Sequence, residues 1–445
     1  MSALAIILWT TFGGLFIATV TVLALLPSRY EKPSATSGNT SVSVQILVLG
    51  DIGRSPRMQY HALSIARHGG TVHLIGYDES PPHPDLLTSP NVTIHGLATP
   101  PKILRSPSIP FIISGPLKVL WQVCTLLYVL GYQAPASTWL LVQNPPSIPT
   151  LAISFVMSIL RNTQLMIDWH NYGWTILAGT KGPSHPFVAL SKAYEIALAN
   201  TAPSANITVS HAMRHELRGP PYNIQSPIVT LHDRPASIFQ PLSSESEREA
   251  ILTALPTTAP FAASVLEGKT KLIVSSTSWT PDEDFSLLLD ALVSYAKTSP
   301  PPVPIVAIIT GKGPQKASYE AKIEALQAAN QLPGIVIQTA WLSIADYAGL
   351  LRCADLGVLV DMFGSGLPVV AYSAYASFDE LVKERLNGSG FETADELAAL
   401  LAQLFGREWQ GEELAALQRG AMYESKLRWD EEWDRVLGRV FGFTE

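Results

Sequence analysis

The chain has 445 residues, which is enough for two or three domains with substantial cores. Hydrophobic residues make up 47% of it and charged residues 15%, a balance that favours association with a membrane. The net charge of −7 argues against nucleic acid as the main partner, because no broad basic surface is available. Cys124 and Cys353 lie far apart without a CxxC pattern, so a reducing compartment fits better than a disulfide framework.

The N-terminal stretch is predicted to be a membrane anchor. Residues 3–26 carry no charge and could cross a bilayer core of roughly 30 Å as a helix. No basic residue precedes this run and no small-residue cleavage site ends it, so residues 1–27 are interpreted as an uncleaved transmembrane helix. Arg29 and Lys32 follow it and place the rest of the chain in the cytosol. Glycosylation at any of four sequons would contradict this orientation: Asn39, Asn91, Asn206 and Asn387.

After the anchor, apolar runs typical of strands alternate with helical segments. This alternation predicts α/β domains with parallel sheets and helical crossovers. The first domain is predicted over residues 44–240 and the second over residues 269–405. A flexible tether is expected at residues 28–43, a linker at residues 241–268 and further helices at residues 406–445.

One apolar stretch inside the first domain has more than one interpretation. Residues 109–132 are strongly apolar but are interrupted by Gly115, Pro116 and Lys118. We favour a helix at the membrane interface or an ordinary core helix over a second membrane span.

The first domain opens with a strand, a glycine turn and a helix, in the segment VLGDIGRSPRMQYHA. Backbone N–H groups and the helix dipole converge at such a turn and bind anions. Gly50 and Gly53 form the turn, and Arg54 and Arg57 supply donors suited to phosphate oxygens. A GxxG turn after a strand is also common without a ligand, so an ordinary structural turn is the alternative.

His170 is the candidate catalytic residue of the first domain. It follows a predicted strand ending at Asp168, and ligands bind beyond the carboxyl ends of parallel strands. This placement brings it to the same edge of the sheet as the glycine turn. The alternative is a histidine with a structural role.

Two loops of the second domain carry candidate binding residues. Lys312, in the turn GKGP, is placed to contact a diphosphate, or else is a solvated loop lysine. Asp282, Glu283 and Asp284 could form an acidic metal motif, but acids in a first helical turn are explained by capping and the helix dipole. The sequence contains no strong metal-binding cluster.

A set of motifs spread over residues 44–405 resembles one enzyme family. They are GDIGRSPRMQYHA, DWHNYG, MRHEL, HDRP, STSWTPDEDFSLLLDAL, ITGKGP and VDMFGSGLPV. Together they resemble the chitobiosyldiphosphodolichol beta-mannosyltransferases, which form glycosyltransferase family 33. The resemblance implies a GT-B fold, in which two Rossmann-like α/β domains face a cleft, here preceded by one N-terminal transmembrane helix.

The resemblance also implies a reaction and its partners. The family transfers the first mannose from GDP-mannose to GlcNAc2-diphospho-dolichol, forming a β-1,4 linkage with inversion. The implied place is the cytosolic face of the endoplasmic reticulum membrane, in lipid-linked oligosaccharide synthesis for N-glycosylation. Other mannosyltransferases of that assembly are candidate partners. No cofactor is firmly implied, and a requirement for a divalent metal stays open.

The resemblance assigns roles to individual residues. His170 becomes the polar group near the transferred sugar, as base or as positioner. The residues expected at the acceptor and its diphosphate are Gly50, Gly53, Arg54, Arg57, Asn171 and Tyr172. The residues expected at the donor are Ser278, Trp279, Gly311, Lys312, Gly313, Trp341, Leu342 and Asp361. Of these, Trp341 and Leu342 would lie at the guanine.

The chain departs from the family pattern near residues 358–360. A serine-rich loop and a following Gly-Leu-Asp-Leu-Pro-Met-Lys-Val segment are absent, so roughly a dozen or more residues are missing by the family motif. Asp361 is then the nearest carboxylate to the donor sugar, with an ordinary position on a helix surface as its alternative. Either a lost segment or an inactive membrane-bound binding subunit would explain this departure, and we favour a lost segment because the flanking motifs are intact. A retaining transferase that uses another nucleotide sugar is a separate alternative, against which the GDIGRSPR and TSWTPDEDF strings argue.

Overall fold

The computed structural model describes most of the chain after the predicted anchor. Nearly all of the anchor at residues 1–27 and of the tether at residues 28–43 lies outside the described residues. The described residues are 13, 14, 17, 18, 21, 42–105, 108–202, 204–235, 238–280, 283–298, 302–358, 363–406, 411–426 and 428–443.

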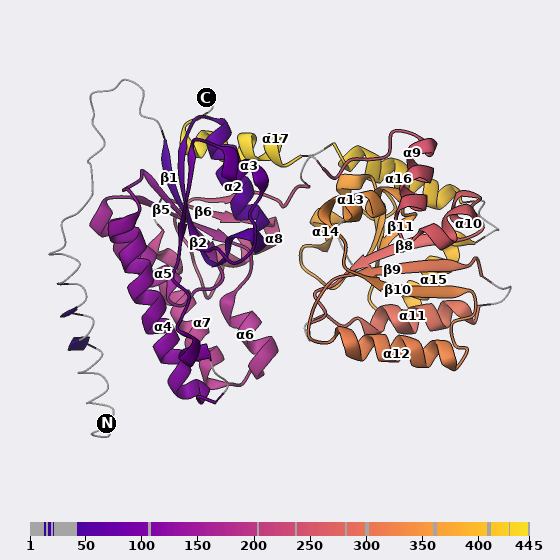
Figure 1. Ribbon diagram of the computed structural model, residues 1–445, viewed down its shortest axis with the longest axis horizontal. Coiled ribbons are helices and arrows are strands. Elements are labelled where there is room, and N and C mark those ends of the chain that lie inside the picture. The colour runs from indigo at the N-terminus through magenta and orange to yellow at the C-terminus, as the bar shows by residue number, and fades with distance from the viewer. Residues whose placement is uncertain are drawn as a thin grey trace. The chain divides into compact units, whose positions relative to one another are not determined.

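The chain folds into two compact α/β units (Figure 1). The first unit comprises Met1–His232 and Trp433–Glu445, and the second comprises Asp233–Glu432. Much of the predicted linker belongs to the second unit, because it forms α9 (Glu245–Ala254) and α10 (Ala262–Leu266). Both helices contribute side chains to the core of that unit, including the buried Leu252 and Val265.

The first unit is built on a parallel sheet of seven strands, in the order β3-β2-β1-β4-β5-β6-β7. Its central strands are buried on both faces, as expected for near-continuous apolar runs. The strands are β1 (Ser43–Asp51), β2 (Thr71–Tyr77), β3 (Val92–Gly96), β4 (Trp139–Asn144), β5 (Gln164–Trp169), β6 (Ala205–Thr208) and β7 (Ile228–Thr230). The helices are α2 (Pro56–Arg67), α3 (Pro84–Thr88), α4 (Phe111–Tyr128), α5 (Thr150–Arg161), α6 (Gly173–Lys181), α7 (Pro186–Leu198), α8 (His211–Arg218) and, near the C-terminus, α18 (Arg439–Phe441).

The apolar stretch at 109–132 becomes α4 and a π-helical turn, η3 (Val129–Gln133). Its C-terminal part packs into the core through Leu126 and Leu130, whereas Ile113 and Leu117 are exposed. Among the described residues, Ile113–Gln133 is the one helical stretch long and apolar enough to cross a membrane by length and composition.

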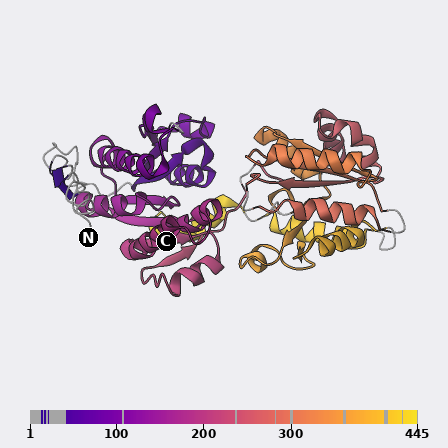
Figure 2. The ribbon, with the colours of Figure 1, turned by 90° about the horizontal axis from the view of Figure 1, so that it is seen from below.

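The second unit is built on a parallel sheet of six strands, in the order β10-β9-β8-β11-β12-β13. Helices cover both faces of this sheet (Figure 2). The strands are β8 (Lys271–Ser276), β9 (Ile305–Thr310), β10 (Ile335–Ala340), β11 (Leu356–Val358), β12 (Val369–Tyr372) and β13 (Gly388–Phe391). The remaining helices are α11 (Ser286–Ala296), α12 (Lys316–Ala328), α13 (Ile344–Cys353), α14 (Phe378–Leu381), α15 (Ala394–Phe405), α16 (Glu412–Glu424) and α17 (Trp429–Trp433), whose last residue belongs to the first unit.

The connection between β11 and β12 is unusually short for two parallel neighbours. Gly357 pairs with Val369 and Val358 with Val370, so only residues 359–368 join the two strands. A parallel crossover normally needs a dozen or more residues, usually with a helix. The described part of this connection holds one 3₁₀ turn, Phe363–Ser365. Residues 359–362, including the donor candidate Asp361, lie outside the described residues.

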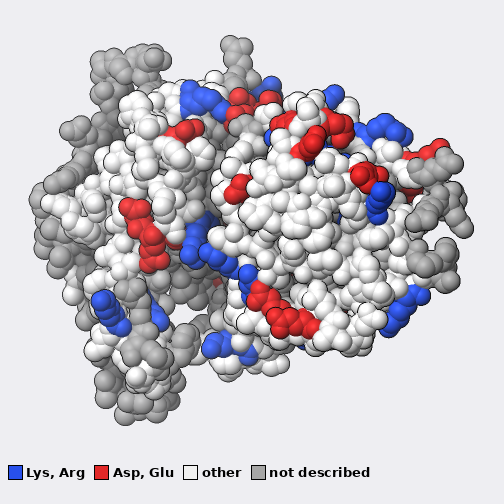
Figure 3. All heavy atoms as spheres, turned by 45° about the vertical axis from the view of Figure 1, so that its right-hand side comes forward, with Lys and Arg blue, Asp and Glu red and all other residues white. Residues whose placement is uncertain are grey.

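Charged side chains are sparse on the face of the molecule shown in Figure 3. Both signs are interspersed there among a larger area of uncharged residues. This distribution agrees with the low charged fraction of the sequence.

Candidate active site

The predicted anion-binding turn of the first unit already holds a carboxylate. Asp51 Oδ1 accepts hydrogen bonds from the backbone N–H groups of Gly53 (3.3 Å), Glu79 (3.3 Å) and Ser80 (3.1 Å). A Cβ at Gly53 would overlap the backbone oxygen of Ser80, which explains the glycine. One N–H donor of the predicted anion-binding turn, that of Gly53, therefore binds a side chain of the same turn, together with two N–H groups that follow β2.

The two arginines after this turn have different surroundings. The side chain of Arg54 is 82% exposed and lies 3.5 Å from Asp51. Arg57 is buried, and its guanidinium binds Asp168 through Nε at 2.8 Å and Nη2 at 3.2 Å. The sequence predicted Arg57 as a diphosphate ligand, but the spacing along α2 turns it toward the sheet and into this ion pair. Arg54 is the arginine that the turn presents to solvent.

Asp168, at the carboxyl end of β5, is the centre of a buried network that includes His170. Its Oδ2 atom lies 3.1 Å from His61 Nε2 and 3.1 Å from His170 Nε2. Burial opposes ionisation of Asp168, but the charge of Arg57 and the hydrogen bonds from His170 and His61 outweigh it and hold the pKa of the carboxyl well below its ordinary value. An ionised Asp168 therefore accepts the Nε2–H of His170 and directs His170 Nδ1 away from the carboxylate.

The loop that carries His170 is held at several points. The backbone N–H of His170 donates to the oxygen of Asn144 at 2.9 Å. Glu195, fully buried on α7, accepts the N–H of Gly173 at 2.7 Å and the hydroxyl of Tyr222 at 2.7 Å. The side chain of Ser147 also donates to Glu195. Sequence reasoning missed Glu195, because an acid within a helical pattern gives no sign that it will be buried.

Asn171 and Tyr172, the other predicted acceptor residues on this loop, differ in exposure. Asn171 is exposed, and its Oδ1 accepts the N–H of Tyr172 at 2.8 Å. Tyr172 is buried and donates its hydroxyl to Glu216 at 2.8 Å. Asn171 can therefore meet a ligand directly, whereas Tyr172 supports the shape of the loop.

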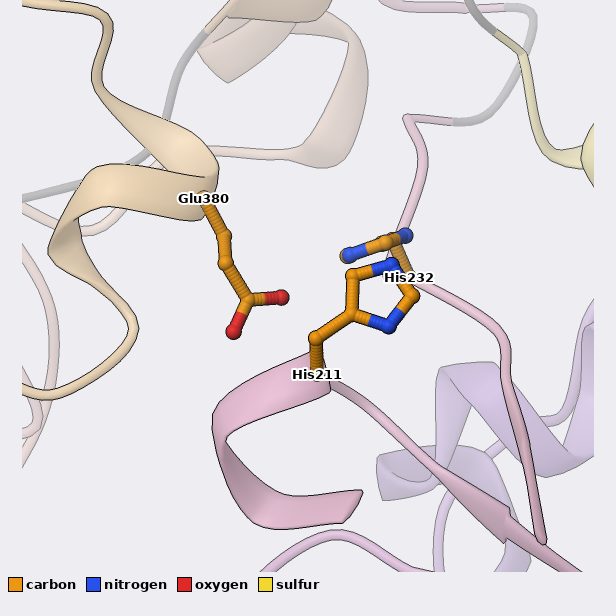
Figure 4. A group of neighbouring side chains, drawn as sticks. All are labelled: His211, His232 and Glu380. Atoms are coloured by element: carbon orange, nitrogen blue, oxygen red, sulfur yellow. The ribbon is translucent and has the colours of Figure 1, made fainter. Parts of the chain in front are cut away.

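Two further histidines lie at the same edge of the sheet. His211 begins α8 after β6, and His232 follows β7. Their rings pack edge to face with centroids 5.1 Å apart (Figure 4). Glu380, also labelled in Figure 4, belongs to α14 of the second unit. His232 begins the motif HDRP, and His211 lies two residues before the motif MRHEL. Because each histidine follows a strand, their positions could have indicated a functional pair.

In the second unit, a glycine turn after β9 packs against the loop after β8. A Cβ at Gly311 would overlap the backbone oxygen of Thr277, and one at Gly313 would overlap that of Ser278. Gly311 also has a φ of 143°, a value that side chains rarely allow. Both glycines are therefore required for the close approach of the two loops.

These loops border a pocket of about 580 Å³ in the second unit. Five of the predicted donor residues line it: Ser278, Gly311, Lys312, Trp341 and Leu342. Lys312 Nζ lies 4.2 Å from the centroid of the Trp341 ring, and Trp341 is 62% exposed. The pocket thus combines a cation with an aromatic face, which suits a nucleotide.

Trp279 was predicted to contact the donor, but the structure places its side chain in the core. It is fully buried and packs against Phe285 and Tyr319, with ring centroids 4.8 and 5.6 Å away. Its φ of 51° turns the side chain away from the loop surface and into the core. Trp279 therefore fixes the loop from beneath.

The acidic segment after this loop has structural partners. Glu283 accepts the N–H and the hydroxyl of Ser278, both at 2.8 Å, and also the hydroxyl of Thr277. Asp284 accepts the N–H of Ser286 at 3.1 Å, at the start of α11. The first-turn capping expected for these acids is wrong, because α11 begins only at Ser286 and has no acid in its first turn; the two acids instead hold the loop that precedes the helix. Asp282 lies outside the described residues.

A second cavity of about 660 Å³ adjoins the pocket in the same unit. The two share Ser276, Thr277 and Glu283, and the second extends to Tyr372 on β12 and Phe378 on α14. It therefore reaches β12, the strand that follows the short connection from β11.

Comparison with known proteins decides the family. A chitobiosyldiphosphodolichol beta-mannosyltransferase of Arthroderma benhamiae is 42% identical over 460 aligned positions, covering 99% of this chain and 100% of the relative. The Homo sapiens protein of that name is 36% identical, covering 90% of this chain and 92% of the relative. The chain belongs to the chitobiosyldiphosphodolichol beta-mannosyltransferase family. It is a glycosyltransferase, and the alternative of a binding subunit without activity is not favoured. No family model matches the chain.

Other similarities agree with this assignment. A relative of Arabidopsis thaliana named "UDP-glycosyltransferase TURAN" is 36% identical over 87% of this chain and 95% of the relative. Among solved structures, a sucrose-phosphate synthase of Thermosynechococcus elongatus has a TM-score of 0.65 at 15% identity, covering 90% of this chain and 98% of that one. Anabaena HepE in complex with UDP has a TM-score of 0.59 at 14% identity, covering 87% and 96%. The GT-B fold expected from the sequence is confirmed.

The alignment with the Arthroderma protein also bears on chain length. It extends over 460 positions, more than the 445 residues of this chain, so the relative has residues without a counterpart here. A segment missing from the β11 to β12 connection would have this effect.

Proposed function

We propose that this chain, or its version with the lost segment restored, transfers mannose from GDP-mannose to the chitobiose of a dolichol-diphosphate acceptor. The product is a β-1,4 linkage formed with inversion, at the cytosolic face of the endoplasmic reticulum membrane. The single observation that carries the mechanism is the Asp168–His170 pair at the carboxyl edge of the first sheet.

The pair is arranged for general base catalysis. With its Nε2–H donated to Asp168, His170 has a lone pair on Nδ1 that can take the proton of the attacking acceptor hydroxyl. The hydroxyl oxygen then bonds to the anomeric carbon of mannose while the bond from that carbon to the GDP oxygen breaks. Attack from the face opposite the leaving group inverts the configuration. Asp168 stabilises the imidazolium that forms.

The pocket of the second unit is the proposed donor site. Lys312 would contact the GDP diphosphate, whose negative charge grows as the bond to mannose breaks. Trp341 offers an exposed ring on which guanine can stack, beside Leu342. The glycine turn brings backbone close to the same space without side chains in the way.

A lipid acceptor also gives the apolar elements a purpose. The predicted anchor at residues 1–27 would hold the enzyme at the membrane that contains its acceptor. The exposed N-terminal part of α4, with Ile113 and Leu117, would contribute to that contact. Arg54 is the proposed donor to the acceptor diphosphate.

His170→Ala tests the proposal. With GDP-mannose and a phytanyl-diphosphate chitobiose acceptor, the variant should lose about a hundredfold or more in kcat, because the general base is gone. Its melting temperature should stay close to that of the parent chain, because His170 is partly exposed. His215→Ala, at an exposed position on α8, serves as the matched control and should keep full turnover.

Two results would contradict the proposal. The first is a His170→Ala chain that turns over normally, which would remove the assigned base. The second is the absence of mannose transfer both by the present chain and by one with the missing segment restored, which would remove the reaction itself.

A further inference from the structure

The chain returns to the first unit at Trp433, after the whole of the second unit. Trp433 is fully buried there, and its indole Nε1 lies 3.0 Å from His61 Nδ1. It stacks on His68 and Phe441, with ring centroids 5.5 and 5.8 Å away. In Figure 1 the yellow C-terminal segment correspondingly ends among the indigo elements of the first unit.

This contact and the bond to Asp168 together leave His61 with one proton, on Nε2. An indole N–H can only donate, so His61 Nδ1 must accept and cannot carry a proton in this arrangement. The ring proton is then on Nε2, which lies 3.1 Å from Asp168 Oδ2 and donates to it. Complete burial lowers the pKa of His61, although Asp168 opposes this shift. The ring is therefore neutral and carries a single N–H proton.

The protonation of His61 affects His170 through Asp168, which both rings contact. His61 and Arg57, both on α2, fix the orientation of the carboxylate to which His170 Nε2 also donates. Without the indole N–H, His61 could take a second proton on Nδ1, and the positive charge of its ring would draw the carboxylate oxygen away from His170. The hydrogen bond that holds His170 would then lose its fixed acceptor.

We propose that Trp433 is a positioning residue for His170, acting through His61 and Asp168. The C-terminal segment is thereby part of the catalytic machinery of the acceptor-binding unit, although it follows the donor-binding unit in sequence. The inference rests on the proposed function for the role of His170.

The charged groups near this chain of contacts are few among the described residues. Arg57 and His170 face Asp168. On the outer side of Trp433, Asp434 lies 3.4 Å from His68 Nε2 and 3.8 Å from Arg67 Nη2. Of these groups, His68 stacks on the indole face rather than on its N–H group, so it does not fix the proton of His61.

Trp433→Phe is the decisive variant, because it keeps an aromatic ring and removes the N–H donor. Its kcat should fall about ten- to a hundredfold, as for other residues that orient a catalytic group, while KM for GDP-mannose stays unchanged. The acidic limb of the pH profile of kcat should move to lower pH, because His61 can then take a second proton beside Asp168. Phe441→Leu is the matched control: it disturbs the same aromatic packing without touching a hydrogen bond, and should keep kcat.

A double variant separates coupling from general damage. In His61→Gln the side-chain amide can donate an N–H to Asp168 whether position 433 holds Trp or Phe, because an amide does not take up a proton. Trp433→Phe should therefore reduce kcat in the parent chain but have little further effect in the His61→Gln background. An equal loss in both backgrounds, or no loss in the parent, would overturn the inference.

A spectroscopic measurement tests the same inference without turnover. In spectra of full-length chain with ¹⁵N-labelled histidine, His61 should show a proton on Nε2 and none on Nδ1. Trp433→Phe should let His61 carry a second proton on Nδ1, and Phe441→Leu should preserve the singly protonated ring. If His61 is unchanged in Trp433→Phe, the inference fails even where mannose transfer is detected. If the protonation of His61 changes but no chain transfers mannose, the proposed function fails instead.

Discussion

Asp168 is a fully buried carboxylate whose partners all come from the same unit. It forms a two-point ion pair with Arg57 and accepts hydrogen bonds from His61 and His170. Such a group is costly to bury alone, and its removal leaves the opposite charge buried without compensation. Asp168 therefore contributes to stability as well as to the orientation of His170.

Replacing Asp168 by Asn should destabilise the first unit by about 3 to 5 kcal/mol, because the buried Arg57 loses its counter-charge. Urea unfolding at neutral pH measures this change. Asp85→Asn, at an exposed position on α3, is the control and should change stability by less than about 0.5 kcal/mol. Equal stability of Asp168→Asn and the parent chain would show that the ion pair adds nothing.

The same carboxylate predicts how stability depends on pH. Its pKa is lowered in the folded state, so its contribution is fully present above the unfolded value of about 3.9. The contribution is lost as the pH falls from there through the lower folded pKa. Between about pH 5 and pH 3 the parent chain should thus lose more unfolding free energy than Asp168→Asn does. Parallel loss in the two chains would contradict this assignment.

At the scale of elements, the donor-side loops depend on two close backbone approaches. The turn after β9 can lie against the loop after β8 only because Gly311 and Gly313 have no side chains. Trp279 supports the loop from the core, and Glu283 holds it through Ser278. The pocket is consequently shaped by backbone, with few side chains free to adjust.

Gly311→Ala should therefore raise KM for GDP-mannose by about tenfold or more, because the loops must separate to admit the methyl group. The positive φ adds roughly 1 kcal/mol of strain. Gly179→Ala is the control: it lies on α6 with open space around the added carbon, and should be neutral or slightly stabilising. Initial-rate kinetics over a range of GDP-mannose concentrations measure the difference. An unchanged KM in Gly311→Ala would place the donor elsewhere.

At the scale of the whole molecule, the short β11 to β12 connection is the feature that sets this chain apart from the family pattern. Every other connection between neighbouring strands of this sheet includes at least one helix. We propose that the donor-side carboxylate and backbone contacts expected from the family pattern belong to a segment lost from this connection.

Inserting the corresponding segment of the Arthroderma relative between Val358 and Val369 should raise kcat/KM for GDP-mannose by at least about tenfold. One charge-assisted hydrogen bond to the donor, worth about 1.5 to 3 kcal/mol, is sufficient for this gain. An insertion of Gly and Ser residues of equal length is the control, since it relieves the short connection without supplying side chains. If both insertions leave the rate unchanged, the missing segment does not limit catalysis.

Most of the architecture could be predicted from local sequence. The apolar runs at β1, β4 and β8 and their turn residues predicted parallel α/β domains, because strands buried on both faces give near-continuous apolar stretches. The motifs gave the family, and comparison with relatives confirmed it. His170 was predicted from its place after a strand, because the carboxyl edge of a parallel sheet gathers such loops, and its catalytic role stays a prediction.

What the sequence by itself determined was the order of elements, the family and the loops that carry polar groups, since each depends on residues close together in the chain. Only the tertiary structure decided which groups meet. It put the carboxylate of Asp51 into the glycine turn, turned Arg57 inward to Asp168, and brought Trp433 to His61 from 372 positions away. These contacts depend on packing between distant segments, and no local pattern records which face of a helix will be buried against which strand.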